Sequence, residues 1–478
     1  TMVPQENVLN GLQGRVTGVQ INQTGGVGSS IMMVIRGATS LTSDNQPLFV
    51  IDGMPVTNGL NNLQRMGDRN IVDYGNAISD LNPEDIESIS VLKGPSAAAL
   101  YGSRAGNGVV LITTKKGKRG KELGVSFSTN NSFENPTRLL DFHYEHANGE
   151  RTAVLDEGSA YWSGPKLDVG NTAIQWNSPV GPDGNRQPTP LCSYPDNMYD
   201  FLQTSITSDN NIAVSGGSEN SSYRLSYNHM SHRGLIPNSD LFRNSLNASL
   251  DFDLSDRFKV TTNINFLRSN SSDRPATGNR GANALQAVYA WSHANVNDMR
   301  DYWVPGQEEI EQLRPSDEGD NPYFIAYGVN NAFARDRIYG NLKLDYKVSD
   351  EFSIFGRVAY DGFNEFRETK IPWSYRRERN GGYFITDINR RETNSDFLAS
   401  YSKQISDFNV QASFGGNYMK QFYQSNYTGS ARNAGLVIPG LYSVSNIPQD
   451  GLQVSNDRWE KAIYSLYALA SIGFKDQL

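Results

Sequence analysis

The feature that most constrains the fold is a period-two alternation of apolar and polar residues over long stretches. From Ile338 to Tyr346, the even positions are mainly apolar and the intervening positions mainly polar. Phe258–Phe266 and Phe408–Phe414 alternate in the same way. This pattern is typical of strands with one apolar face. Soluble strands average about five to six residues, whereas a tilted membrane-spanning strand needs about nine to eleven, so the length favours a membrane barrel over a soluble sandwich or propeller.

The connections between these stretches alternate between short and long. Residues 254–258, 348–352 and 405–408 are similar tight turns that contain Ser-Asp, and residues 216–220 form an earlier one. The longer connections are expected at about 134–208, 232–240, 270–336, 365–392 and 421–458. Transmembrane barrels have short periplasmic turns and longer extracellular loops. The sequence therefore predicts a mainly β protein with an antiparallel transmembrane β-barrel.

Ten barrel strands are expected in the second part of the chain. They fall at about 124–133, 209–216, 222–231, 241–254, 258–266, 338–346, 351–364, 393–405, 408–414 and 459–474. A barrel this small has room only for side chains or one small ligand, and it could not enclose the domain of some 118 residues that precedes it. We therefore expect residues 119–478 to be the first part of a larger barrel that continues beyond Leu478.

Residues 1–118 are predicted to form a small α+β domain. Its expected strands are Val16–Ile21, Ile31–Arg36, Leu48–Ile51, Glu87–Leu92 and Gly108–Thr114, separated by Gly, Pro and Asn. A helix is expected at residues 94–102, because Pro95 takes the first helical position and Gly102 lies just beyond the end.

Composition and motifs exclude several classes of function. The net charge is −8, so a nucleic-acid partner has no electrostatic footprint. No stretch approaches the 18 consecutive apolar residues of a spanning helix. The five histidines lack the acids or cysteines that would complete a metal site, and no catalytic constellation is visible. We therefore expect neither an enzyme nor a metal or cofactor site.

Three ordered stretches carry a resemblance to a known family. They are Ile35-Arg36-Gly37, residues 47–55 (Pro-Leu-Phe-Val-Ile-Asp-Gly-Met-Pro), and residues 82–117, which include Leu100-Tyr101-Gly102-Ser103-Arg104. Together they resemble the plug domain of SusC/RagA-type TonB-dependent outer-membrane transporters, over roughly residues 8–118. The resemblance implies an N-terminally trimmed plug followed by about half of a 22-stranded barrel.

The resemblance also implies a set of plug-motif and gating residues. They are Arg36, Gly37, Asp52, Gly53, Lys93, Gly94 and Arg104. For Arg36 and Arg104 it suggests contacts with acidic residues of the barrel wall, with a solvated charge at a turn as the alternative. Asp52-Gly53 is expected to be a turn rather than a ligand site.

The activity implied by the resemblance is TonB-dependent import of an oligosaccharide or peptide across a Bacteroidota-like outer membrane. Its implied partners are a SusD-like surface lipoprotein, TonB through a segment missing from this chain, and outer-membrane lipid. Five loop tryptophans are candidates to bind cargo, with packing inside the loops as the alternative: Trp162, Trp176, Trp291, Trp303 and Trp373. A siderophore-type receptor and a passive structural or adhesive β-domain are the competing hypotheses.

Overall fold

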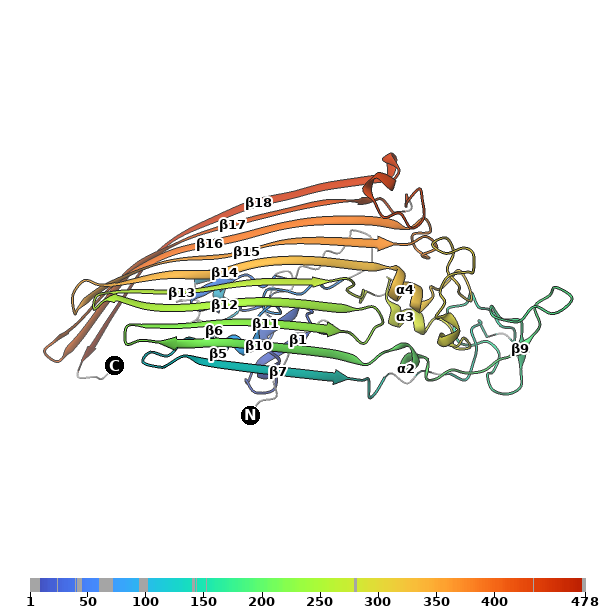
Figure 1. Cartoon of the computed structure of the whole chain (residues 1–478), viewed down its shortest axis with the longest axis horizontal. Helices are drawn as coiled ribbons and strands as arrows, with labels where there is room; N and C mark the ends of the chain where they lie inside the picture. The colour runs from blue at the N-terminus through green and yellow to red at the C-terminus, as the bar shows by residue number, and fades with distance from the viewer. Residues whose placement is uncertain are drawn as a thin grey trace.

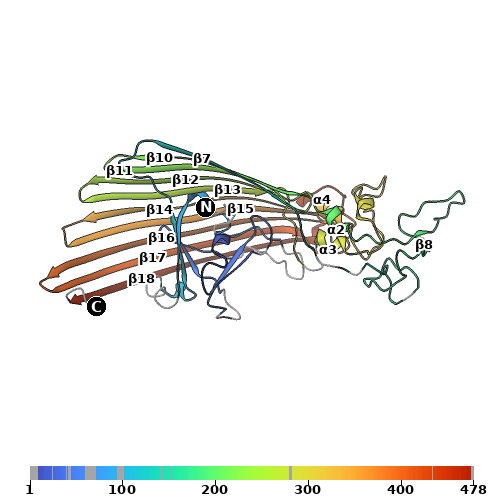
Figure 2. The same cartoon turned by 90° about the horizontal axis from the view of Figure 1, so that it is seen from below.

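The chain folds into a long curved sheet with a small domain against one of its faces (Figures 1 and 2). A computed structural model describes residues 9–23, 25–38, 40, 45–59, 72–93, 102–139, 142, 144–151, 153–278, 282–432 and 434–474. Figure 2 shows the N-terminal segments, in blue, lying beneath the sheet. The sheet is called the wall below.

The wall is a ten-stranded antiparallel sheet in which each strand pairs with its neighbours in sequence. Its strands are β7 (Gly124–Glu134), β10 (Ser205–Gly217), β11 (Ser221–Arg233), β12 (Asp240–Ser255), β13 (Phe258–Ser271), β14 (Asn330–Lys347), β15 (Phe352–Ile371), β16 (Gly382–Ile405), β17 (Phe408–Ser430) and β18 (Leu452–Phe474). The predicted strands and the mainly β fold class are therefore confirmed. The predicted total of 22 strands stays a prediction.

Several strands are longer than the sequence indicated. The loop predicted at 365–392 is reduced to residues 372–381, and the one at 421–458 to 431–451. The reason is that the outer face becomes polar towards the loop end, so the alternation disappears while the strand continues. The register places one polar row across neighbouring strands: Thr129, Asn210, His229, Asn244, Arg268 and Asp336. The next outer-face row towards the turns is apolar: Phe127, Ile212, Tyr227, Leu246, Phe266 and Ile338.

The two faces of the wall differ as a membrane-spanning sheet requires. The apolar row is exposed on the convex side, with Phe127 at 68% and Leu246 at 52% exposure. The concave side carries buried charged residues, among them Arg335, Arg337 and Glu365. Apolar side chains outside and polar ones inside are typical of outer-membrane barrels. Within the described residues, no helix is long and apolar enough to cross a membrane.

The N-terminal domain contains a mixed four-stranded sheet in the order β4-β3-β6-β5 and a β1–β2 hairpin. Its elements are η1 (Asn10–Leu12), β1 (Val19–Gln23), β2 (Ile31–Ile35), β3 (Leu48–Ile51), β4 (Met54–Val56), η2 (Pro83–Asp85), β5 (Ile86–Leu92), η3 (Gly102–Ala105) and β6 (Val109–Thr114). The first strand begins three residues later than predicted, and β4 was not predicted because it is short and contains Pro55. Most of the predicted helix, residues 94–101, lies outside the described residues.

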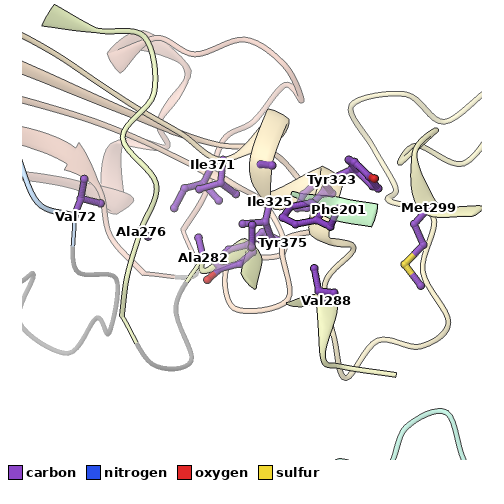
Figure 3. Packing of buried hydrophobic residues seen from close by; sticks show 14 of the residues in the cluster. Val72, Phe201, Ala276, Ala282, Val288, Met299, Tyr323, Ile325, Ile371 and Tyr375 are labelled. Atoms are coloured by element: carbon purple, nitrogen blue, oxygen red, sulfur yellow. The ribbon is translucent and has the colours of Figure 1, made fainter. Parts of the chain in front are cut away.

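The long connections pack into a layer of their own at one end of the wall (Figure 1). This layer contains β8 (Thr172–Ala173), β9 (Thr189–Pro190), α2 (Asn197–Phe201), α3 (Ala284–Val288), η4 (Val296–Met299), α4 (Pro322–Gly328), η5 (Val444–Asn446) and η6 (Gln449–Gly451). Figure 3 shows its apolar core, where Phe201, Tyr323 and Ile325 lie close together. The loops therefore form a packed structure at one end of the wall.

Candidate functional site

The most distinctive site is the contact between the N-terminal domain and the concave face of the wall. Arg335 and Arg337 are two residues apart on β14, so both side chains point to the same face. Both side chains are about 2% exposed, far less than is usual for arginine. Buried charges require partners, and here the partners come from both parts of the chain.

Arg335 joins the N-terminal domain to two wall strands. Its Nη1 donates to Asp80 Oδ2 at 3.1 Å, and its Nη2 donates to the backbone oxygen of Tyr74 at 2.9 Å. Its Nε also pairs with Glu365 of β15. The Asp80 side chain is only 4% exposed, so this ion pair is almost completely screened from water.

Arg337 makes the second set of contacts in the same cluster. Its Nε donates to Asp361 Oδ1 at 2.8 Å, and its Nη1 donates to the backbone oxygen of Ala77 at 2.8 Å. The same Nη1 lies 3.6 Å from Asp80. Asp80 therefore faces two wall arginines at once, and the group is called the Asp80 cluster below.

Arg367 completes the charge balance of the Asp80 cluster. It pairs with Glu365 and lies over the ring of Tyr74, 4.2 Å from its centroid. Its Nη1 and Nη2 are buried and have no hydrogen-bond partner within the described part of the chain. Burial raises the pKa of Tyr74 to about 12, so the ring stays neutral and serves as a cation–π surface. Three arginines thus face three carboxylates.

Arg104, a residue singled out in the sequence, reaches a second wall acid. Its Nη1 donates to Glu392 Oε1 on β16 at 2.9 Å. Thr57 Oγ1 and Asn394 Nδ2 also donate to this carboxylate, each at 2.9 Å. Glu392 is 5% exposed and Arg104 24%, so the pair lies at the edge of the buried contact. The arrangement matches the wall contact that the resemblance suggested for Arg104.

A third contact lies nearer the turn end of the wall. Arg224 Nη1 on β11 donates to Asp85 Oδ1 at 2.6 Å, and Ser226 Oγ donates to the same atom at 2.6 Å. Asp85 ends the short η2 helix, whose N-cap is Asn82. The side chain of Asn82 also donates to Asn211 of β10 at 3.3 Å.

Asp52 and Gly53 form a turn, as expected, and the turn touches the wall. They separate Ile51 from Met54 in the β3–β4 hairpin, with φ values of 48° and 82°. Two positive φ angles are typical of a type I′ turn, for which Asp-Gly is favoured. A Cβ on Gly53 would lie 2.1 Å from Nη1 of Arg357, so any other residue there would require this guanidinium group to move.

The side chain of Asp52 holds the turn in place. Its Oδ1 accepts the N–H of Thr114 at 3.0 Å, and its Oδ2 accepts the Thr114 hydroxyl at 2.7 Å. Thr114 Oγ1 in turn accepts from Asn263 of the wall at 2.7 Å. On the wall side, Arg357 Nη2 donates to Asp396 Oδ2 at 2.7 Å. Asp52 therefore acts as a structural bridge.

Three other predicted plug-motif residues, Arg36, Gly37 and Lys93, lie in the described part of the N-terminal domain. Arg36 is exposed at φ 59°, and its N–H donates to Gly18 O at 2.7 Å. Gly37 follows it at φ 92°. Lys93 Nζ donates to the backbone oxygen of Thr17 at 2.6 Å. Gly94 lies outside the described residues.

The five candidate tryptophans lie in the loop layer, where several are used for packing. Trp291 is 3% exposed and its Nε1 donates to Glu157 O at 2.9 Å. Trp303 packs edge-on against Phe324, with centroids 5.3 Å apart. These two side chains support the core of the layer, in line with the packing alternative.

The remaining three tryptophans are partly buried. Trp373 Nε1 donates to Leu436 O at 3.2 Å, and the Trp162 ring lies 5.7 Å from that of Tyr144. Trp176 Nε1 is buried without a hydrogen-bond partner in the ranges that the structure describes.

The loop layer also contains an open pocket. Glu157, Glu318 and Asp320 supply carboxylates to its lining, and Arg376 and Arg377 supply guanidinium groups. Burial raises the pKa of Asp320, although its carboxylate accepts the N–H of Arg376 at 2.8 Å. A pocket with both signs of charge and aromatic neighbours suits a polar ligand.

Residues 2–109 match the TonB-dependent Receptor Plug Domain family. The TonB-dependent receptor SusC of Bacteroides thetaiotaomicron is 31% identical over 366 residues, 71% of this chain and 32% of SusC. The RagAB peptide importer in its open-open state superposes with a TM-score of 0.71 at 20% identity, covering 99% of this chain and 51% of that one. The chain belongs to the SusC/RagA-type TonB-dependent transporters.

Other relatives agree with this SusC/RagA-type assignment. TonB-dependent receptor P3 of Formosa agariphila is 28% identical over 441 residues, 90% of this chain and 38% of P3. The chain thus spans less than half the length of these curated relatives. Residues 2–109 of the N-terminal domain match the plug of this family, and the predicted domain boundary at residue 118 stays a prediction.

Sequence reasoning found Arg104 in this SusC/RagA-type chain but missed the wall residues of the site. Glu392, Arg335, Arg337 and Arg357 were not singled out because charged residues on an inward face look like ordinary lumen positions. One signal was available: the inward positions of β14 near Arg335 carry two arginines in close succession.

Proposed function

We propose that this chain is part of a transporter that imports an oligosaccharide or a peptide across a bacterial outer membrane. The observation that supports this proposal is the set of buried ion pairs between plug and wall, centred on the Asp80 cluster. A plug held in this way blocks the concave space of the wall, so import requires that it rearrange. The long-loop end faces the exterior and the short turns face the periplasm.

The energetics support an external source of work. Breaking a buried ion pair by removing one partner costs about 3–5 kcal/mol, and separating plug from wall would unpair several groups together. A cost of 3 kcal/mol already reduces the open population by a factor of about 150. TonB supplies the force in this proposal, and a SusD-like lipoprotein captures ligand at the loop end.

Two features support the proposed substrate class. The loop pocket carries both carboxylates and guanidinium groups, which suit the charged ends and side chains of a peptide. Its aromatic lining, which includes Tyr289 and Trp291, also suits sugar rings. The structurally similar RagAB is a peptide importer, whereas a siderophore receptor would carry an iron chelate instead.

A reversible crosslink between plug and wall tests the proposal. In the full-length protein with Cys192→Ser, cysteines replace Thr57 and Gln421, whose side chains lie 3.4 Å apart. Uptake of labelled oligosaccharide or peptide should stop when the crosslink forms and return on reduction. The matched control places cysteines at Ser400 and Ser413, a 3.0 Å pair within the wall, and should leave uptake unchanged.

Two results would count against the proposal. Continued uptake by a fully crosslinked protein would show that the plug does not gate passage. Native mass spectrometry of protein from its own membrane gives the second result: a bound iron chelate without a lipoprotein partner would favour the siderophore receptor. Absence of any cargo in both experiments would favour the passive β-domain.

A further inference from the structure

The convex face of the wall carries a cationic group at the level where it changes from apolar to polar. The polar row described above continues across the sheet to Arg458 on β18. Beside it, Arg391 of β16 and Phe422 of β17 are direct cross-strand partners. The Cζ atoms of Arg391 and Arg458 lie 4.5 and 5.4 Å from the centroid of the Phe422 ring, so two guanidinium groups contact one ring.

Two further charges complete this group, which is called the Phe422 cluster. Lys420 Nζ lies 3.5 Å from Glu460, and Arg458 Nη2 lies 3.2 Å from the same carboxylate. The cluster therefore holds three cations and one anion, an excess of two positive charges. The side chains of Lys420 and Arg458 are 52% and 60% exposed, so both can reach an external ligand.

An open apolar hollow lies next to the Phe422 cluster, towards the turn end of the wall. Leu342, Val358, Tyr418, Tyr464, Phe397 and Leu466 line it. Tyr418 and Lys420 are two residues apart on β17, so they share a face and are about 7 Å apart along the strand.

Small residues create the hollow. Gly356 and Gly416 lie in one cross-strand row with Phe397 between them, and their missing side chains leave space on the outer face. A Cβ on Gly356 would meet nothing within 4 Å, whereas one on Gly416 would lie 2.8 Å from Phe397. Gly356 is therefore a position where the hollow can be filled without a clash.

We propose that the Phe422 cluster and the hollow together bind one anionic membrane lipid, with its phosphate at the cations and an acyl chain in the hollow. The proposal rests on the outer-membrane placement of the proposed function. A phosphate accepts paired hydrogen bonds from a guanidinium fork, and the Phe422 ring keeps both forks beside the headgroup level. Charge above and apolar space below fit the two ends of such a lipid.

Lipid retention by the full-length protein tests this site. The protein is placed in nanodiscs of phosphatidylcholine with a minor fraction of phosphatidylglycerol, released, and examined by native mass spectrometry. The wild type should retain phosphatidylglycerol over phosphatidylcholine. Arg391→Gln with Arg458→Gln should reduce that retention roughly tenfold or more, because each cation near an anionic headgroup contributes several-fold.

Arg268→Gln provides the matched control. Arg268 lies on the same face and in the same polar row as Arg458, but it pairs with Asp336 at 3.8 Å, and the next row towards the turns holds Leu246, Phe266 and Ile338 instead of glycines. Its variant should retain lipid as the wild type does. Equal retention by the double variant, or an equal loss in the control, would overturn the proposal.

Two further measurements distinguish the contribution of the lipid headgroup from that of its acyl chain. Gly356→Leu should lower retention of long-chain phosphatidylglycerol more than that of a short-chain form, and an equal effect would remove the hollow from the site. Inorganic phosphate at millimolar concentration should not displace the lipid, and displacement would show a simple anion site. A protein that fails to enter nanodiscs would contradict the proposed function itself, whereas an inserted protein without lipid preference contradicts only this site.

Discussion

Asp80 has an unusually demanding position, because it is a plug carboxylate that faces Arg335 and Arg337 of the wall in a nearly dry environment. Its side chain is 4% exposed, and the nearest guanidinium nitrogens lie at 3.1 and 3.6 Å. In such surroundings the loss of one partner leaves an uncompensated charge. This contact therefore differs in kind from the exposed ion pairs on the turns.

Asp80→Asn should loosen the plug. The variant leaves the two arginines with fewer anions, so we expect docking to weaken by about 3 kcal/mol, which is a roughly hundredfold faster amide exchange in residues 76–81. Hydrogen–deuterium exchange of the full-length protein measures this change. Glu84→Gln is the control, because its 3.9 Å pair with Lys115 is exposed and should contribute less than about 1 kcal/mol. Similar exchange in the two variants would contradict the special role of Asp80.

Asp273 provides a pH-dependent prediction at the loop end. Burial, reinforced by nearby Asp240, raises the pKa of its carboxyl to about 8, although Oδ1 accepts the N–H of Asn331 at 2.8 Å. The folded state therefore holds the proton more tightly than the unfolded chain, whose Asp pKa is about 3.9. Stability is full below about pH 4 and falls as the pH rises through 8, by at most about 1.4 kcal/mol per unit.

Asp273→Asn should remove most of this slope, since the amide can keep the bond to Asn331 without a charge. Urea titrations in detergent at pH 5 and pH 8, followed by tryptophan fluorescence of the loop layer, give the comparison. A slope that persists in the variant would assign the pH dependence to other groups.

At the residue level the sequence identified only part of the site. Arg104 and the Asp52-Gly53 turn were recognisable because short motifs surround them. Asp80 and Arg335 were not, since they are 255 residues apart and meet only through the register of the wall. Arg36 shows the opposite: a clear motif singles it out in the sequence, but its side chain is exposed in the structure.

At the level of elements, the β3–β4 hairpin shows how one turn serves two purposes. Its positive φ angles suit the hairpin, and its missing side chain at Gly53 admits Arg357 of the wall. Strands were predictable from alternation, but their loop ends were not, because the outer face of β15 to β17 becomes polar while hydrogen bonding continues. β4 was missed because three residues carry too little pattern.

Gly53→Ala should destabilise this hairpin through both backbone strain and a clash with Arg357. We expect a cost of about 2–3 kcal/mol in plug stability, measured by urea titration of the full-length protein with a probe on the plug. Gly37→Ala is the matched control: its φ is 92°, but a Cβ there meets nothing within 4 Å. The stability of this variant should fall only by the cost of the backbone strain, about 1 kcal/mol. An equal loss in both variants would mean that the contact with Arg357 adds nothing.

At the scale of the whole molecule, the loops and the turns lie at opposite ends of the wall (Figure 1). Alternation and connection length predicted this arrangement, and the curved sheet agrees with them. The packing of the loops around one apolar core was not predictable, because that core joins loop segments to plug and wall residues between Val27 and Phe384, far apart in the sequence.

Cysteine labelling should show which end faces outwards. In a Cys192→Ser background, Glu150→Cys lies in the loop layer and Glu219→Cys in a short turn, and both positions are exposed. A membrane-impermeant maleimide should label residue 150 in intact cells and residue 219 only after the outer membrane is permeabilised. Labelling of the turn in intact cells would reverse the orientation.

The contribution of wall residues to the plug has a consequence for biogenesis. Tyr339 and Ala359 of the wall belong to the same apolar core as Phe49 and Ile112 of the plug. During synthesis the plug emerges first, and its interior stays unfinished until β14 and β15 exist. We therefore expect residues 1–118 expressed alone to be degraded rapidly by periplasmic proteases in a pulse-chase experiment, while the longer chain persists. A stable isolated plug would contradict this. Completion of the wall would then act as a quality-control step, because only a chain with an assembled wall has a folded plug that blocks the concave space.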